Sequence, residues 1–365
     1  MRRLSDTIDR LHRGYAVPAA LPGGAATRLK PLAATGANPG NLKAWCHVPD
    51  ANDPMPLVVV LHGCTQSAAG YDLGSGWSVL AEAHRFAVVF PEQQRANNPN
   101  LCFNWFSPDD TRRGSGEALS IREMVATMVE RYAIDPARVF VTGLSAGGAM
   151  ATSLLASYPD VFAGGAIVAG LSAGAASTMP QAFDRMRGHG HADATRAAAH
   201  VRQASDHRGP WPVVSVWHGS ADATVAPSNA EATLRQWRAI NDLPAAPDLE
   251  ETVDGAVHRE WRDRDGRVRL EDWRIAGMGH GTPVATAGAT ACGSPGPYML
   301  DVGISSTWRS AARWGLLDPA VTVDRQRRTG EAPQPAVVYP RPGQGARPGI
   351  QDTIEAALRS AGMMR

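Results

Sequence analysis

One serine of this chain stands between glycines directly after a short apolar run. Ser145 is the centre of GLSAG (143–147), which follows VFV (139–141) and precedes a segment of small and apolar residues. Gly-x-Ser-x-Gly between a strand and a helix is typical of a sharp turn that presents a nucleophilic hydroxyl beside a helix N-terminus, where partial positive charge stabilises a developing anion. A glycine-rich turn that only packs well has the same composition, so the pentapeptide alone leaves both interpretations open.

A nucleophilic serine needs a base, and the base needs a carboxylate that orients it. In hydrolases with this kind of turn, the chain order is serine, then aspartate or glutamate, then histidine. Asp222 follows the apolar run PVVSVWHG (212–219), and His280 lies between glycines in GMGHG (277–281), after another strand-like run. Taken singly, Asp222 is equally explained by a turn or cap, and His280 by an exposed loop. Together and in this order they predict a triad of Ser145, His280 and Asp222.

Acyl transfer also needs hydrogen-bond donors for the oxyanion, each typically worth ~3 kcal/mol. One donor is expected to be the backbone N–H of Ala146, the residue after the nucleophile. The second is expected from LHGCTQ (61–66), where we assign it to the backbone N–H of Cys64 and not to the thiol. His62 in this segment is a candidate substrate contact, with bracing of the loop as the simpler interpretation. Met278 is a candidate for the acyl pocket, with packing as the simpler interpretation.

The elements that must position these residues alternate between apolar runs and segments of helical periodicity. This alternation predicts an α/β fold with a mostly parallel sheet and helices on both faces. The segment 251–276 is expected to form a hairpin, and 172–209 interrupts the alternation and is expected to form a small cap. Strands are expected at 56–63, 85–92, 138–143, 164–170 and 212–219, and helices at 77–84, 120–132, 147–158 and 303–316.

Composition and charge argue against several classes of function. The 365 residues carry a formal charge of +1, from 36 basic and 35 acidic residues. The net charge therefore creates no electrostatic field that would favour binding to nucleic acid or to an anionic membrane. Four cysteines without a CxxC pair suggest neither a disulfide scaffold nor zinc. His189 and His191 have no further potential metal ligands nearby in the sequence, so a solvated loop is predicted there. We expect no metal and no organic cofactor.

No apolar run approaches the ~20 residues of a membrane-spanning helix. The basic N-terminal segment lacks the apolar core, roughly 7–15 residues long, of a signal peptide, so a cytoplasmic protein is expected. Three parts are expected: an amphipathic helix and linker (1–41), a catalytic domain (42–317), and a Pro-rich linker with a C-terminal amphipathic helix (318–365).

Five separated motifs give the chain a family resemblance. With them it resembles the poly(3-hydroxyalkanoate) depolymerase family of esterases, close to feruloyl and acetyl-xylan esterases, over about residues 40–317. RRGSGE (112–117) and PGPYMLDVGISST (295–307) also fit this family. The resemblance implies an α/β-hydrolase fold, an ester substrate and the same three catalytic residues. The motifs are LHGCTQ (61–66), NWF (104–106), GLSAGGAM (143–150), HGSADATV (218–225) and GMGHG (277–281).

The resemblance also suggests that Trp105 and Trp217 lie near the substrate, with core packing as the alternative for both. If Cys64 and Cys102 were paired, the bond would tie the oxyanion loop to the loop of the NWF motif. A reducing cytoplasm would disfavour that bridge.

Secreted members of this family usually carry a signal peptide and a separate polymer-binding domain, and neither is visible here. We therefore expect soluble oligomers or small esters as substrates, although the resemblance leaves a secreted location open. The C-terminal helix either docks on a partner or polymer granule or is an inert tail, which we favour because short amphipathic segments are common.

The expected function is a serine carboxylic-ester hydrolase that acts on 3-hydroxybutyrate-type polyester or its oligomers. A feruloyl or acetyl-xylan esterase with the same triad is the alternative. A peptidase is disfavoured because no peptide-anchoring domain is visible. A non-catalytic binding scaffold is disfavoured because such proteins usually lose a triad residue.

Overall fold

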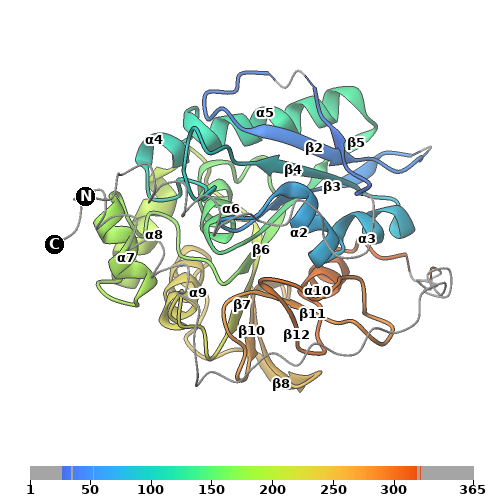
Figure 1. Cartoon of the computed structure of the whole chain (residues 1–365). Helices are drawn as coiled ribbons and strands as arrows, with labels where there is room; N and C mark the ends of the chain where they lie inside the picture. The colour runs from blue at the N-terminus through green and yellow to red at the C-terminus, as the bar shows by residue number, and fades with distance from the viewer. Residues whose placement is uncertain (1–26, 34–35, 52, 319–320, 322–365) are drawn as a thin grey trace, which may run out of the picture.

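A ten-stranded sheet forms the centre of the computed structural model, which describes residues 27–33, 36–51, 53–318 and 321 (Figure 1). The strand order is β1-β2-β4-β3-β5-β6-β7-β10-β9-β8. These strands are β1 (Lys30–Pro31), β2 (Lys43–His47), β3 (Met55–Leu61), β4 (Ala87–Glu92), β5 (Ile134–Leu144), β6 (Gly164–Val168), β7 (Val213–Gly219), β8 (Leu249–Val253), β9 (Ala256–Arg262) and β10 (Val268–Ile275). A separate parallel pair consists of β11 (Thr282–Val284) and β12 (Met299–Asp301).

The middle of the sheet is parallel and its edges are antiparallel. Strands β4, β3, β5, β6, β7 and β10 run parallel to one another. Strands β1 and β2 extend one edge in antiparallel register, and β9 and β8 extend the other. Strand β3, with the sequence MPLVVVL, is buried along its whole length, as expected for a parallel strand covered on both faces. The predicted α/β fold with a mostly parallel sheet is therefore confirmed.

Two apolar cores lie on the two faces of the sheet. Leu57 and Val59 of β3 join one core, and Val58 and Val60 join the other, because successive side chains of a strand point to opposite faces. The first core includes residues of α5, α6 and α9, and the second includes residues of α2, α3 and α10. The helices are α2 (Ala68–Ser75), α3 (Trp77–His84), α4 (Pro108–Thr111), α5 (Gly116–Arg131), α6 (Ala146–Ser157), α7 (Met179–Met186), α8 (Ala194–Gln203), α9 (Ser228–Ile240) and α10 (Ser306–Arg313).

The structure differs from the sequence-based expectation in three elements. The segment expected as one hairpin contains β8, β9 and β10, and β10 also pairs with β7 in parallel register. Helix α9 was not predicted, although it buries Leu234, Trp237 and Ile240 at helical spacing. Strand β2, which lies between β1 and β4, was not predicted either, because its five residues are too few to display a period.

The expected three-part division lies partly outside the described residues. The N-terminal helix, the Pro-rich linker and the C-terminal helix expected from the sequence all fall there. The segment 172–209, expected as a cap, contains α7 and α8, which lie next to α9 (Figure 1). Within the described part of the chain, no helix is long and apolar enough to cross a bilayer.

Candidate active site

Ser145 occupies a strained turn between β5 and α6. Its φ of 57° and ψ of −115° are a combination that costs a non-glycine residue about 1–3 kcal/mol. Its N–H donates to the carbonyl oxygen of Val168 in β6 at 2.9 Å. A Cβ on Gly143 would lie 2.4 Å from the carbonyl carbon of Gly147, and a Cβ on Gly147 would lie 2.4 Å from the carbonyl oxygen of Leu61. Only glycine fits on both sides, so the sequence dictates a turn that places the serine at the N-terminus of α6.

Asp222 and His280 are hydrogen-bonded at the carboxyl ends of two adjacent strands. Strands β7 and β10 pair in parallel, so the loops that follow them meet at one edge of the sheet. Nδ1 of His280 lies 2.8 Å from Oδ2 of Asp222, and the side chains of the two residues are 6% and 0% exposed. Oδ1 of Asp222 accepts the N–H of Thr224 at 2.9 Å and that of Val225 at 2.8 Å. The carboxylate is thus fixed by its own turn.

A second histidine contacts the same carboxylate. Nε2 of His218 lies 3.3 Å from Oδ2 of Asp222 and 2.8 Å from the carbonyl oxygen of Val225, so this nitrogen carries a proton and donates. Burial alone would raise the pKa of Asp222, but the hydrogen bonds from His218 and His280 outweigh it and hold the pKa below its usual range. Asp222 is therefore ionised at neutral pH and keeps the proton of His280 on Nδ1.

The other ring nitrogen of His280 is available for chemistry. Nε2 is buried and has no hydrogen-bond partner among the residues described. With the proton held on Nδ1, Nε2 of the neutral ring has a free lone pair, as a general base requires. Ala146, next to Ser145, and Val225, in the loop of Asp222, belong to one buried apolar cluster, so the turn and the loop both border that cluster.

The loop after β3 is tied to the loop of the NWF motif. Cys64 forms a disulfide bond with Cys102, the pairing considered from the sequence. The N–H of Thr65 also donates to the carbonyl oxygen of Asn100 at 2.7 Å. Cys64 and Ala146 share the buried cluster described above, so the two segments expected to supply oxyanion donors adjoin.

The two tryptophans expected near the substrate lie in different environments. Trp105 is 7% exposed and belongs to the cluster that contains Cys64 and Ala146, so substrate contact stays a prediction for it. Trp217 is 1% exposed and stacks on Trp273, with 4.6 Å between ring centroids. Its side chain lies in the core between the sheet and α10, which favours the packing alternative.

His62 and Met278 are also buried, which favours loop bracing for His62 and packing for Met278 over substrate contact. His62 is fully buried, with Nδ1 2.7 Å from the carbonyl oxygen of Gly63, while Nε2 accepts the N–H of Gln93 at 3.1 Å. Burial lowers the pKa of His62, so the ring is neutral and braces the loop after β3. Met278 is 3% exposed and packs in the same core as Trp217.

One group of potential metal ligands lies on the paired strands β9 and β10. Within the described ranges, the ligand atoms of His258, Glu260 and Glu271 lie within 4.8 Å of one another. Neither His189 nor His191 belongs to such a set. Arg313 contacts both carboxylates of that set. Carboxylates already paired with arginine are best explained as a buried ion network between β9, β10 and α10.

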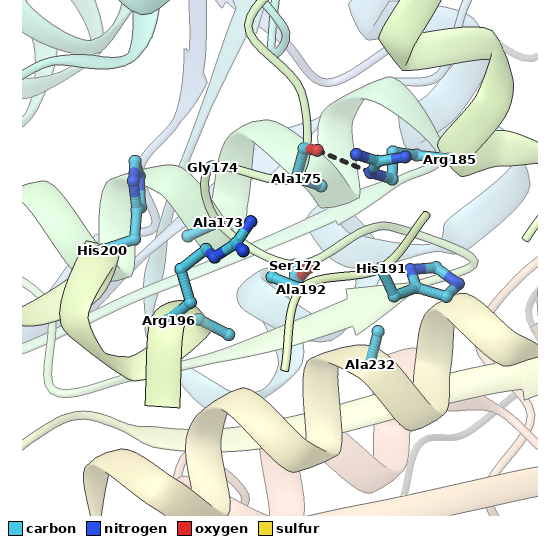
Figure 2. A pocket seen from close by; sticks show the side chains of 11 residues that line it. Ser172, Ala173, Gly174, Ala175, Arg185, His191, Ala192, Arg196, His200 and Ala232 are labelled. Atoms are coloured by element: carbon cyan, nitrogen blue, oxygen red, sulfur yellow. Dashed lines mark hydrogen bonds between the residues drawn. The ribbon is translucent and has the colours of Figure 1, made fainter. Parts of the chain in front are cut away.

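A cavity of about 120 Å³ lies between the cap segment and α9 (Figure 2). Basic side chains of α7 and α8 surround it, and Nε of Arg185 donates to the carbonyl oxygen of Ala175 at 3.0 Å. Its lining contains none of the residues expected for catalysis, so it offers no argument about the ester site. The lining residues are Ser172, Ala173, Gly174, Ala175, Arg185, His191, Ala192, Arg196, Ala197, His200 and Ala232.

Sequence reasoning did not single out two side chains near the site. His218 opens the motif HGSADATV, four residues before Asp222, and that proximity was the available signal. Gln93 follows β4, and nothing in its local sequence indicates its contacts with His62 or with Glu117.

Comparisons with known proteins show which proteins the chain is similar to. A family model described as esterase PHB depolymerase matches residues 45–252. Poly(3-hydroxyalkanoate) depolymerase C of Paucimonas lemoignei is 47% identical over 287 residues, which cover 77% of this chain and 69% of that protein. Probable acetylxylan esterase A of Aspergillus clavatus is 33% identical over 260 residues, which cover 68% of this chain and 82% of that protein. The solved acetyl xylan esterase from Aspergillus awamori has a TM-score of 0.67 at 25% identity and covers 79% of this chain and 99% of its own.

Proposed function

Because the chain belongs to the esterase PHB depolymerase family and is a carboxylic ester hydrolase, we propose that it cleaves 3-hydroxybutyrate-type polyester chains or their oligomers through Ser145, His280 and Asp222. The observation that carries the assignment of residues is the 2.8 Å hydrogen bond between Asp222 and His280. It leaves Nε2 of His280 free, at the same edge of the sheet as the strained turn of Ser145.

In the first half of the proposed reaction, an acyl-enzyme forms. Nε2 of His280 takes the hydroxyl proton of Ser145 as Oγ attacks the ester carbonyl carbon. The carboxylate of Asp222 stabilises the resulting imidazolium through Nδ1–H. The imidazolium then protonates the leaving oxygen, so that the alcohol departs and the acyl group stays on Oγ.

In the second half, water releases the acyl group. Nε2 of His280 takes a proton from water as the water oxygen attacks the acyl carbonyl carbon. Oγ of Ser145 leaves with that proton, and the carboxylic acid is released. Each step uses only groups of this chain, its substrate and water.

In both halves of the reaction, hydrogen-bond donors must stabilise the negative charge that develops on the carbonyl oxygen. The N–H of Ala146 lies in the first turn of α6, where the helix dipole adds to its effect. The N–H of Cys64 belongs to the adjoining loop, which the disulfide bond fixes. Two donors held in place in advance are worth about 3 kcal/mol each to the transition state.

The choice of substrate follows from the family and from the relatives. The depolymerase relative shares 47% identity with this chain, and the acetylxylan esterase relative shares 33%. An acetyl-xylan esterase remains the second candidate, supported by the solved acetyl xylan esterase with a TM-score of 0.67.

Substrate turnover separates the two candidates. We expect the protein to hydrolyse p-nitrophenyl butyrate and soluble 3-hydroxybutyrate oligomers, and to release acetate from acetylated xylan at a kcat/KM at least tenfold lower. Hydroxybutyrate release from the oligomers and acetate release from xylan are measured on the same preparation. Faster turnover of acetylated xylan than of the oligomers would replace the depolymerase assignment with the second candidate.

The disulfide bond bears on the cellular location expected from the sequence. Such bonds persist in oxidising compartments, so the Cys64–Cys102 bridge supports an oxidising location over the cytoplasm. Denaturation of cells of the native host in the presence of excess alkylating reagent, followed by mass measurement, is expected to label two cysteines, Cys46 and Cys292. Reduction before alkylation should raise the number to four. Four labelled cysteines without reduction would contradict both the bridge and the oxidising location.

A further inference from the structure

One motif of the family resemblance has no part in the mechanism so far. RRGSGE ends in Glu117, which lies in the first turn of α5 and is 1% exposed. A carboxyl group so deeply buried is costly unless hydrogen bonds or charges compensate it. Its partners therefore indicate what it does.

Three N–H groups converge on the Glu117 carboxyl. The backbone N–H of Asn104 donates to Oε2 at 2.9 Å. The side-chain amide of Asn104 donates to Oε1 at 2.8 Å, and that of Gln93 donates to Oε1 at 2.6 Å. Both partners belong to the segment 93–104, which also carries Cys102 and leads into Trp105. Glu117 thus holds the start and the end of one loop.

Gln93 links this carboxyl to the oxyanion loop by two routes. Its side-chain amide also donates to the carbonyl oxygen of Cys102 at 3.1 Å, and Cys102 is bonded to Cys64. Its backbone N–H donates to Nε2 of His62 at 3.1 Å, and Nδ1 of His62 then donates to the carbonyl oxygen of Gly63 at 2.7 Å. Both routes end beside the N–H that the proposed mechanism assigns to the oxyanion.

We propose that Glu117 is a positioning residue that holds the oxyanion loop in its reactive arrangement through Gln93, Asn104 and the disulfide bond. The inference rests on the proposed function, because it concerns the donor of Cys64. Glu117 touches no substrate in this account. It acts through the segment 93–104.

The protonation state of Glu117 decides how well this network fits. A carboxylate only accepts hydrogen bonds, and all three partners donate. A protonated carboxyl would turn one O–H toward a donor, so at least one hydrogen bond would be lost.

Burial raises the pKa of Glu117 to about 8, against the lowering effect of its hydrogen bonds, and the nearby Asp110 raises it further. Asp110 of α4 is the charged group that faces Glu117, because Arg112 and Arg113 pair with Asp109 and Asp160. The loop should therefore be best ordered, and kcat highest, above about pH 8.

The test compares wild type with Glu117→Gln, which resembles the protonated carboxyl at every pH. With p-nitrophenyl butyrate from pH 6.5 to 9.5, we expect wild-type kcat to rise through about pH 8. We expect Glu117→Gln to lack this rise and to have a kcat at pH 9 about tenfold to a hundredfold lower, with KM within about threefold. Glu130→Gln, at an exposed position of the same helix, is the matched control and should behave as wild type.

Two outcomes would overturn the proposal. One is a wild-type kcat and an unchanged pH profile in Glu117→Gln. The other is a lower melting temperature with a wild-type kcat per active site, counted by titration with an organophosphonate, because a purely structural role predicts that result. If the wild-type protein hydrolysed no ester at all, that result would contradict the proposed function itself, and it can be distinguished from the two outcomes above.

A second variant keeps the test decisive if Glu117→Gln does not fold. Gln93→Met removes the side-chain link to Cys102 but leaves both hydrogen bonds between Glu117 and Asn104. We expect it to lower kcat at pH 9 in the same direction, with little change in KM. A wild-type kcat in this variant would overturn the proposal.

Discussion

Replacement of Ser145 by alanine is expected to lower kcat for p-nitrophenyl butyrate and for 3-hydroxybutyrate oligomers by about 10,000-fold or more. The variant lacks the oxygen that forms the acyl-enzyme, and no neighbouring group replaces it. The fold should persist, because Oγ makes no hydrogen bond with the described residues and alanine tolerates the positive φ about as well as serine does. Initial rates and a thermal melt on the same preparation measure both effects.

Ser153→Ala is the matched control for this experiment. Ser153 lies in the same helix, is also buried, and donates only to the carbonyl oxygen of Ala149 at 3.1 Å. Its replacement should leave kcat within about twofold of the wild-type value, since a hydroxyl hydrogen-bonded to its own helix contributes little to stability. If Ser145→Ala kept more than a tenth of the wild-type rate, the nucleophile would have to be sought elsewhere.

Replacement of Asp222 by asparagine is expected to lower kcat by about 1,000-fold to 10,000-fold, with little change in KM. Two backbone N–H groups donate to Oδ1, so the amide oxygen of asparagine should take that position. The amide NH₂ would then face His280 and His218 where the carboxylate oxygen now accepts. Nδ1 of His280 would have to accept a hydrogen bond, which places the ring proton on Nε2 and leaves no lone pair there for the serine proton.

Asp265→Asn provides the control for the change of charge. Its side chain is 70% exposed in the turn between β9 and β10, where the loss of one carboxylate should not alter kcat measurably. Both variants are assayed from pH 6 to 9 so that a shifted optimum is not mistaken for a lost rate. A loss smaller than tenfold in Asp222→Asn at its own optimum would show that Asp222 does not orient the base.

Local sequence was sufficient for the features that depend on neighbouring residues. The turn of Ser145 could be predicted because the close approach of Gly147 to Leu61 requires glycine, a constraint that is visible in the sequence itself. The apolar run of β3 indicated a strand buried on both faces. The pairing of Asp222 with His280 could be proposed from the chain order of serine, aspartate and histidine.

Features that depend on the direction of a side chain could not be predicted in this way. Trp217 lies two residues from the end of β7, and nothing in the local sequence shows whether its side chain contacts the substrate or packs in the core. In the structure it faces Trp273 of β10, whose parallel pairing with β7 was not expected. His62 likewise points away from the edge of the sheet toward Gln93, a partner 31 residues further along the chain.

The role of Glu117 shows the same limit for buried polar groups. The sequence places it at the end of a motif, but its partners lie 13 and 24 residues earlier, at the two ends of a loop. A hydrogen-bond network of this kind depends on tertiary packing, so residue spacing along the chain does not reveal it.

Covalent labelling of the nucleophile tests the central claim most directly. The protein is incubated with a fluorophosphonate until ester turnover ceases, digested, and sequenced by tandem mass spectrometry. We expect one phosphonyl group per chain, on Oγ of Ser145, with activity lost in proportion to labelling. Loss of activity with the adduct on another residue, or with Ser145 unmodified, would contradict the assignment of Ser145 as the nucleophile.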